Sequence, residues 1–170
     1  MSMQVAETER LRLRWLDVDD AAFILELVNE PSWIRYIGDK AVKTLQDAAN
    51  YIRNGPMAMY RRLGFGLYLV ELKQTREPAG ICGLIRRTGL QNEDLGFAFL
   101  PRYWNKGYAL ESASAVMAHA RVLGLSRVVA ILSHDNYRSG RLLEKLGFRF
   151  EGTIRLQADD DELDLYAAAS

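Results

Sequence analysis

The feature that most constrains the fold is a strand-like run that stops at a proline and restarts as a helix. The run is Phe97 to Leu100, the proline is Pro101, and the helical part begins near Gly107. A strand that feeds a helix through a loop of small residues leaves N–H groups of the first turn without partners, at the positive end of the helix dipole. Such a loop suits a phosphate group.

The residues of this loop allow two interpretations. Gly107 permits close backbone approach, Ala109 is small, and Lys106 adds a mobile positive charge suited to a phosphate. An ordinary strand-to-helix connection has the same appearance in sequence, because glycine-containing loops are weak signals. Both interpretations stay open at this stage.

Length and composition favour one domain over residues 1–170, since 170 residues with 49% hydrophobic content can bury a proper core. Lys+Arg and Asp+Glu both number 22, without a basic run, so we expect no nucleic-acid partner. Cys82 is the only cysteine and His119 and His134 the only histidines, so we predict neither an intramolecular disulfide nor a metal site. No apolar run reaches the length of a membrane span, and we expect a cytoplasmic protein.

Apolar periodicity and turn residues predict strands and helices along the first half. A strand over 11–15 and a helix from Asp17 or Asp19 to about Asn29 come first, followed by an apolar segment, 33–37, without a clear element. Thr44 and Asp47 form a possible capping box for a second helix, which we expect Gly55-Pro56 to interrupt.

The second half predicts an antiparallel meander followed by alternating helices and strands. The meander strands are 67–72, 79–86 and 94–100, and Gly96 suggests a bulge or a close backbone approach in the last of them. A helix over 113–124 ends at Gly124, and a strand over 127–133 follows it. A helix over 136–147 begins after Asn136, and strands over 148–154 and 163–166 come last. A mixed α/β sheet in one domain follows.

Four sequence blocks, in this order, resemble the GCN5-related N-acetyltransferase (GNAT) family, most of all its branch of ribosomal-protein and N-terminal amine acetyltransferases. The blocks cover much of the chain: 7–14, 94–97, 103–112 and 136–148. In the third block Trp104 stands where the family usually has Gln or Arg, and Asn105 replaces an optional glycine. Asparagine adopts the left-handed conformation more readily than most residues.

The resemblance implies a fold, a cosubstrate and a binding mode. The fold is α/β (α+β), a mixed, mostly antiparallel sheet with splayed central strands and helices on both faces. The cosubstrate is acetyl-CoA, without a metal. Its pyrophosphate would lie on the N–H groups of the loop, at Asn105, Lys106, Gly107, Tyr108 and Ala109. Its pantetheine arm would lie along the central strand, at Phe97, Ala98 and Phe99. An amide of this arm would lie near Asn136 and Ser139 of the last block. Arg102 or Arg141 could add phosphate or base contacts.

The reaction implied by the resemblance needs a base, a carbonyl-polarising group and an acid. Asp94 is the expected base, with Glu93 as substitute, and a main-chain N–H near Phe97 would polarise the carbonyl. Ser139 would protonate the departing thiolate, although Asn136 and Ser139 also fit a plain helix cap. Glu111 is expected to compensate the helix dipole.

The acceptor stays open at the sequence level. A protein N-terminus is the first candidate from the branch, and a small amine such as a polyamine, amino sugar or amino-acid derivative is the second. Trp33, Tyr36 and Trp104 are candidates for lining the acceptor side, and the acidic run Asp159 to Glu162 is expected to be solvated. The rival class is a non-catalytic acyl-CoA-binding module. A generic nucleotide-binding domain is disfavoured, because no Lys-Ser/Thr pair follows a glycine loop. The chain could be a monomer or a homodimer.

Overall fold

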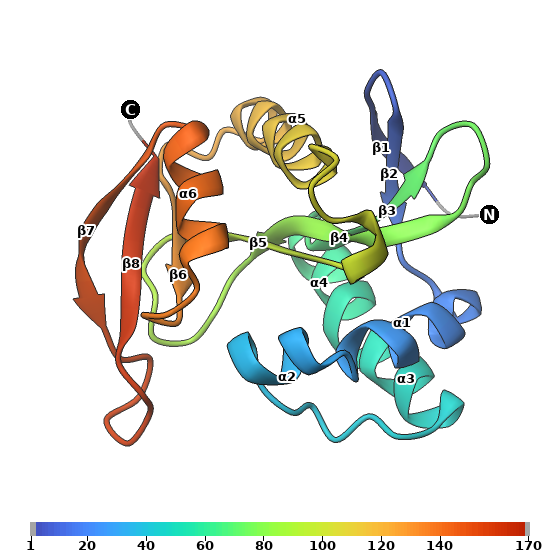
Figure 1. Ribbon diagram of the computed structural model, residues 1–170, viewed down its shortest axis with the longest axis horizontal. Coiled ribbons are helices and arrows are strands. Elements are labelled where there is room, and N and C mark those ends of the chain that lie inside the picture. Colours follow the sequence, from blue (N-terminus) through green and yellow to red (C-terminus); the bar gives the residue numbers. More distant parts are fainter. Residues whose placement is uncertain (1–2, 169–170) are drawn as a thin grey trace.

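The computed structural model describes residues 3–168 and contains one eight-stranded sheet in the order β1-β2-β3-β4-β5-β6-β8-β7. Every neighbouring pair is antiparallel except β5 and β6, which run parallel (Figure 1). The strands are β1 (Gln4–Glu7), β2 (Leu11–Trp15), β3 (Leu67–Leu72), β4 (Pro78–Ile85), β5 (Glu93–Phe99), β6 (Val128–Leu132), β7 (Phe148–Ile154) and β8 (Leu163–Ala168). The mixed, mostly antiparallel sheet predicted from the sequence is therefore confirmed.

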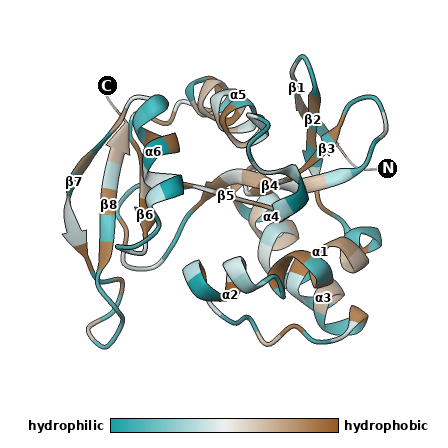
Figure 2. Ribbon diagram, viewed as in Figure 1, coloured by the Kyte–Doolittle hydropathy of each residue, from teal (hydrophilic) through white to brown (hydrophobic). Residues whose placement is uncertain are grey.

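Helices cover both faces of the sheet, as predicted (Figure 1). They are α1 (Ala21–Val28), α2 (Pro31–Tyr36), α3 (Leu45–Ile52), α4 (Ala58–Leu63), α5 (Tyr108–Val122) and α6 (Tyr137–Lys145), with short turns at η1 (Val18–Asp20), η2 (Arg53–Met57) and η3 (Pro101–Tyr103). Brown and teal alternate around α1 and α5 in Figure 2, as expected of helices with one buried side.

Two hydrophobic cores lie on opposite faces of the sheet. Val116 of α5 belongs to the core that contains Leu95 and Phe99 of β5, whereas Ile24 of α1 and Ile52 of α3 belong to the other. Because successive strand side chains point to opposite faces, β5 contributes to both cores. The central strand is therefore fixed from both sides.

Local signals set the ends of several helices. The Thr44 side chain accepts a hydrogen bond from the N–H of Asp47, and the Asp47 side chain accepts one from the N–H of Thr44. These two bonds confirm the capping box. Gly124 follows α5 with a φ of 80°, the left-handed conformation that ends many helices. These ends depend on neighbouring residues alone, which is why the sequence predicts them.

The sheet opens in its middle. Strands β5 and β6 pair only at Glu93 with Val128 and at Asp94 with Val129, and the rest of β5 has no partner on that side. Helix α5, which joins them, begins at the open end of β5 (Figure 1). The resulting gap is the splay that the family resemblance implies.

Three local predictions have different outcomes, and the expectation of no clear element after Asn29 is wrong. The segment after Asn29 forms a helix, α2, which begins with Pro31 at a first-turn position where proline costs nothing. The Gly55-Pro56 pair interrupts the second helix, as predicted: α3 ends at Ile52, and a π-helical turn that contains the pair leads into α4. Of the two alternatives for Gly96, the bulge is wrong, since Gly96 pairs in regular register with Gly83. A Cβ at this position would lie 3.1 Å from Cδ1 of Ile85, so its surroundings are close.

Candidate active site

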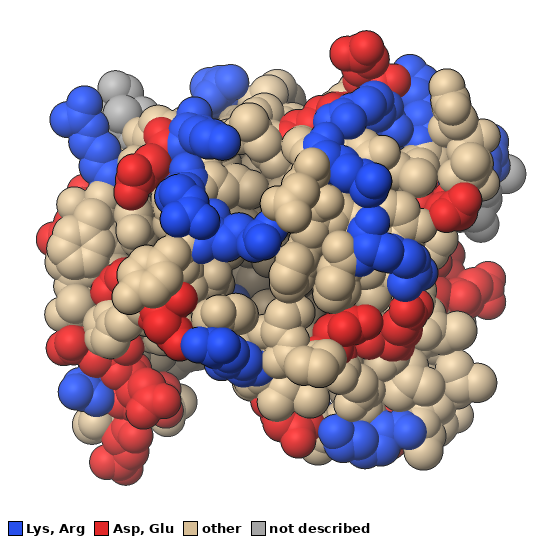
Figure 3. Space-filling view, in the orientation of Figure 1, with Lys and Arg blue, Asp and Glu red and all other residues tan. Residues whose placement is uncertain are grey.

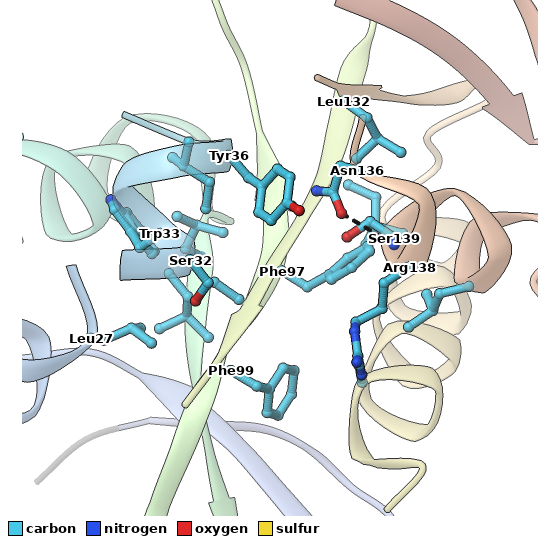
Figure 4. Close-up of a pocket in the computed structure, with 18 of the residues that line it drawn as sticks. Leu27, Ser32, Trp33, Tyr36, Phe97, Phe99, Leu132, Asn136, Arg138 and Ser139 are labelled. Carbon is cyan, nitrogen blue, oxygen red and sulfur yellow. Dashed lines mark hydrogen bonds between the residues drawn. The ribbon is translucent and has the colours of Figure 1, made fainter. Parts of the chain in front are cut away.

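A cavity of about 830 Å³ occupies the gap between β5 and β6. It is lined by β5 and by residues of α2, the start of α5 and the start of α6, which face one another across the gap (Figure 4). In the space-filling view the centre of this face is hollowed, and Lys and Arg side chains gather around it (Figure 3). The cavity therefore combines an apolar strand edge with a positively charged rim.

The loop before α5 presents free backbone donors to this cavity. Gly107 has a φ of 84° and Asn105 a φ of 62°, so both are left-handed, as proposed for Asn105 from its residue type. Within residues 3–168 the N–H groups of Gly107, Tyr108 and Ala109 meet no acceptor. Three free donors at the start of a 15-residue helix form a cradle that fits a phosphate.

Side chains around the loop fix its shape. Arg138 of α6 donates to Oδ1 of Asn105 at 2.9 Å, and its guanidinium lies 4.7 Å from the centre of the Trp104 ring. Asn105, Gly107, Tyr108 and Ala109 all line the cavity. Lys106 does not, and its carbonyl oxygen accepts a hydrogen bond from Arg10.

The edge of β5 is open toward the gap at alternate residues. The N–H of Leu100 donates to Ala79 of β4, so by alternation the backbone groups of Phe97 and Phe99 point to the opposite side, into the gap. The indole Nε1 of Trp104 donates to the carbonyl oxygen of Phe99 at 2.8 Å. Both backbone groups of Phe97 and the N–H of Phe99 remain for a ligand. The hydrogen bond from the Trp104 indole to Phe99 gives Trp104 a role in the structure that the sequence did not predict.

Asp94 is a buried carboxylate that lines the cavity. Its exposed fraction is 1%, and its two oxygens accept hydrogen bonds from Nε of Arg87 at 3.1 and 3.3 Å. Burial raises the pKa of Asp94 to about 6, while the positive charge of Arg87 works in the opposite direction. Glu93 pairs with Arg86 at 3.6 Å and does not line the cavity. Asp94 is thus better placed than Glu93 to accept a proton from a bound ligand.

Asn136 and Ser139 lie together on the α6 side of the cavity (Figure 4). The Asn136 side-chain oxygen accepts a hydrogen bond from the backbone N–H of Ser139 at 3.4 Å, which confirms the helix cap. This bond uses the backbone of Ser139, so its hydroxyl has no partner within the described residues. Capping and a second role in the cavity are compatible.

The opposite wall comes from α2 and the helices behind it. Trp33, Tyr36 and Trp104, the aromatic residues singled out from the sequence, all line the cavity. Lys40 and Tyr51 also line it, as does Arg87. Sequence reasoning missed these three because they lie in separate parts of the chain and only the fold brings them together.

Two further candidates lie away from the cavity. The Glu111 carboxylate accepts hydrogen bonds from the Thr8 hydroxyl at 2.5 Å and from Arg10 at 2.8 and 3.0 Å, so it joins α5 to the β1–β2 turn. Arg102 pairs with Glu26 at 2.8 Å, whereas Arg141 lines the cavity. Of the two arginines considered for phosphate contacts, only Arg141 is in position.

Some kinds of site are not found among the described residues. Residues 3–168 contain no group of three or more His, Cys, Asp or Glu side chains arranged to hold a metal ion. In the same range, no helix combines the length and apolar character needed to cross a membrane.

Comparison with known proteins adds a family to this geometry. The family model described as an acetyltransferase (GNAT) domain matches residues 10–149. An uncharacterized N-acetyltransferase of Bacillus subtilis, YoaA, is 31% identical over 153 residues, which cover 89% of this chain and 86% of that protein.

Solved structures share the fold. An acetyltransferase from Agrobacterium tumefaciens superposes with a TM-score of 0.83 at 23% identity, covering 100% of this chain and 96% of that one. The ribosomal L7/L12 alpha-N-protein acetyltransferase RimL, in complex with coenzyme A, gives a TM-score of 0.79 at 20% identity, with 96% of each chain covered.

Proposed function

The chain belongs to the acetyltransferase (GNAT) family, and from this premise we propose that it transfers the acetyl group of acetyl-CoA to a primary amine inside the gap between β5 and β6. The observation that carries the proposal is the juxtaposition, in one cavity, of the free N–H groups of the α5 loop, the open edge of β5 and the buried Asp94 carboxylate. A cytoplasmic location belongs to the same proposal.

The loop and the strand edge fit the two ends of acetyl-CoA. The N–H groups from Asn105 to Ala109 would bind the pyrophosphate, although Lys106 itself does not line the cavity. The backbone of Phe97 to Phe99 would pair with the pantetheine arm as an added strand, and Asn136 would hold an amide of that arm. Because Trp104 already uses the carbonyl of Phe99, this pairing would rest on Phe97 and on the N–H of Phe99.

The chemistry follows from the groups around the bound thioester, which supplies an electrophilic acetyl carbonyl. Asp94 would accept the proton that the acceptor ammonium must lose, directly or through a water. The N–H of Phe97 would polarise the carbonyl while the nitrogen–carbon bond forms and the carbon–sulfur bond breaks. The Ser139 hydroxyl would donate a proton to the departing thiolate. The second proton, which the nitrogen loses as the amide forms, would restore the hydroxyl through solvent.

Two acceptors fit the proposal. A protein N-terminus is supported by the fold shared with RimL, an alpha-N-protein acetyltransferase. A small amine is supported by contacts that cross the gap: Arg35 of α2 pairs with Asp135 at 3.0 Å, and Ser133 donates to the carbonyl oxygen of Tyr36 at 3.1 Å. These contacts narrow the passage that a peptide would need.

Thiol release from acetyl-CoA, measured against peptide N-termini, polyamines, amino sugars and amino acids, tests the proposal. We expect turnover with one class and a fall of about 10²-fold or more in kcat for Asp94→Ala, a typical loss for a general base. Ser139→Ala should lower kcat and leave acetyl-CoA affinity unchanged. The exposed Asp159→Ala and Ser114→Ala are matched controls.

Two results would count against the proposal. Tight binding of acetyl-CoA without turnover on any amine would favour the non-catalytic binding module. Turnover that survives both Asp94→Ala and Ser139→Ala would leave the transferase intact and refute the roles assigned to these residues.

A further inference from the structure

Two cations face the cavity beyond Asp94, at the end of β5 remote from the phosphate loop. Arg87 follows β4 and Lys40 follows α2, and both line the cavity together with Asp94. The loop before α5 lies at the other end of β5, after Phe99. Acetyl-CoA held by that loop would therefore leave this end of the cavity to the acceptor.

Lys40 has no partner of its own. Within residues 3–168 its ammonium makes no hydrogen bond and no ion pair. Burial lowers its pKa, and the nearby charge of Arg87 lowers it further. Lys40 is nevertheless open to solvent, so water solvates its ammonium, and a bound negative charge would relieve the repulsion between the ammonium and the guanidinium.

Asp94 engages only one of the three nitrogens of the Arg87 guanidinium. Both of its hydrogen bonds to the carboxylate come from Nε, and its two terminal nitrogens meet no acceptor in the described part of the chain. The guanidinium carries a planar fork of donors suited to a carboxylate or a phosphate, and the free half of this fork is available. The cluster thus holds two positive charges and one negative charge.

The other carboxylates of the cavity do not balance this excess. Asp135 is paired with Arg35. Glu30 also lines the cavity, but in the described part of the chain it makes no ion pair with Lys40 or Arg87. Tyr51, which also lines the cavity, is neutral, because burial raises its pKa above the ordinary value.

The geometry points to a binding subsite for an anionic group: the amine acceptor carries a carboxylate or phosphate that binds the Lys40 ammonium and the free donors of Arg87, which directs the amine toward Asp94. The inference rests on the proposed function and narrows its acceptor to amines with a nearby negative charge. Polyamines, which carry only positive charges, would be disfavoured at this site by the same two cations.

Matched acceptor pairs test the subsite during turnover. We compare β-alanine with β-alaninamide, and phosphoethanolamine with ethanolamine, so that the negative charge is the main difference within each pair. The wild-type protein should show a kcat/KM at least about tenfold higher for the anionic member, the effect of one hydrogen bond to a charged group. Equal or better use of both neutral members would overturn the inference while leaving acetyl transfer intact.

The variant Lys40→Gln locates the effect. It should reduce the preference for the anionic member about tenfold, mainly through KM, and Lys40→Glu should reduce it further. Arg62→Gln removes a positive charge from an exposed position on α4 outside the cavity and should change nothing. A preference unchanged in both Lys40 variants would contradict the assignment. Arg87 is left intact, because its removal would strand the buried Asp94 carboxylate.

A binding measurement separates this inference from the proposed function. Should no amine be acetylated, the proposed function fails, and the subsite is tested with glutarate by calorimetry in the presence of coenzyme A. Wild-type protein should bind glutarate and Lys40→Glu should lose at least about tenfold in affinity. Absence of binding to the wild type, or equal binding to both proteins, would overturn the subsite.

Discussion

Asp94 and its partly exposed partner Arg87 illustrate how one ion pair can serve both structure and chemistry. The carboxylate is almost fully buried and keeps a single cationic partner, so its two protonation states lie close in energy near neutral pH. Proton acceptors work best when their pKa lies near the working pH. The environment of Asp94 therefore suits a base in a way that a solvated aspartate does not.

The pH dependence of catalysis should report this carboxyl. Because burial raises the pKa of Asp94 to about 6, the ratio of wild-type kcat/KM to that of Asp94→Asn should be constant above this value. Below it the ratio should fall about tenfold per pH unit as the carboxyl takes up a proton. Ionisation of the amine substrate affects both proteins equally, so it does not change this ratio. Glu93→Gln should keep the wild-type profile, and a ratio that stays flat through pH 6 would contradict the base assignment.

Gly107 is the second residue whose environment has a measurable consequence. Its φ of 84° is strained for any residue with a Cβ, and a Cβ there would lie 3.2 Å from Nη2 of Arg10. Gly107→Ala should cost about 1–2 kcal/mol locally and shift the free N–H groups. We expect acetyl-CoA affinity, measured by calorimetry, to fall about fivefold or more.

Gly124→Ala is the matched control for this prediction. Gly124 has a φ of 80°, with open space around the position of a Cβ, and it lies at the other end of α5. It should incur similar strain without changing acetyl-CoA affinity. Equal losses of affinity in both variants would indicate a general loss of stability in place of a local effect on the phosphate cradle.

At the scale of elements, the start of α5 is held by the β1–β2 turn through Glu111. Burial alone would raise the pKa of Glu111, but hydrogen bonds from Thr8 and Arg10 hold it below its ordinary value. The contact therefore stabilises the fold above about pH 4.5 and loses its effect as the pH falls through the folded-state pKa. The cradle for phosphate is thus attached to the first strands of the sheet.

Removing this attachment should destabilise the protein. Glu111→Ala should lower the free energy of unfolding by roughly 1–2 kcal/mol, the lower part of the range for charged hydrogen bonds, because water screens the exposed Arg10. Urea denaturation at pH 7 measures the change. Glu151→Ala, which breaks the exposed pair with Arg127, should have little effect. A Glu111→Ala protein as stable as the wild type would show that the turn is held by other contacts.

The elements also show what the sequence could and could not predict. The helix caps at Thr44 and Asn136 were predictable, because each depends on residues three apart. Helix α2 and strand β1 could not be predicted in this way. Helix α2 is only six residues long, too short for a periodic pattern, and β1 is a short edge strand paired only with β2.

The site was predictable where a contiguous motif encodes it, as in the loop from Asn105 to Ala109. The meeting of Lys40, Tyr51 and Arg87 beside Asp94 was not, because these side chains come from three separate segments and carry no local pattern. The same holds for Trp104, whose indole bond to Phe99 depends on the turn between them. Tertiary packing decides such contacts.

At the scale of the whole molecule, two parts of one sheet meet at a short parallel contact. Beyond Asp94 the gap separates β5 from β6, and acetyl-CoA would touch β5 and α5 on one side and α6 on the other. A ligand that binds only the folded state stabilises it by about 2.7 kcal/mol at a concentration of 100 times Kd. We therefore expect acetyl-CoA at this concentration to raise the Tm of the protein by roughly 5–10 °C.

The ligand's two ends can be separated in the same experiment. S-acetylpantetheine lacks the pyrophosphate and nucleotide and should raise the Tm less than acetyl-CoA at equal concentration, because it leaves the α5 loop empty. Equal shifts for the two compounds would mean that the loop contributes nothing to binding.

The most direct test of acetyl transfer follows the acetyl group itself. Acetyl-CoA labelled with deuterium in the acetyl methyl group is incubated with the protein and an accepted amine, and mass spectrometry locates the label. We expect the labelled acetyl group to be attached to the amine nitrogen, at a rate that falls about 10²-fold or more in Asp94→Asn. Label found only in free acetate, or retained entirely in the thioester with every amine, would contradict it.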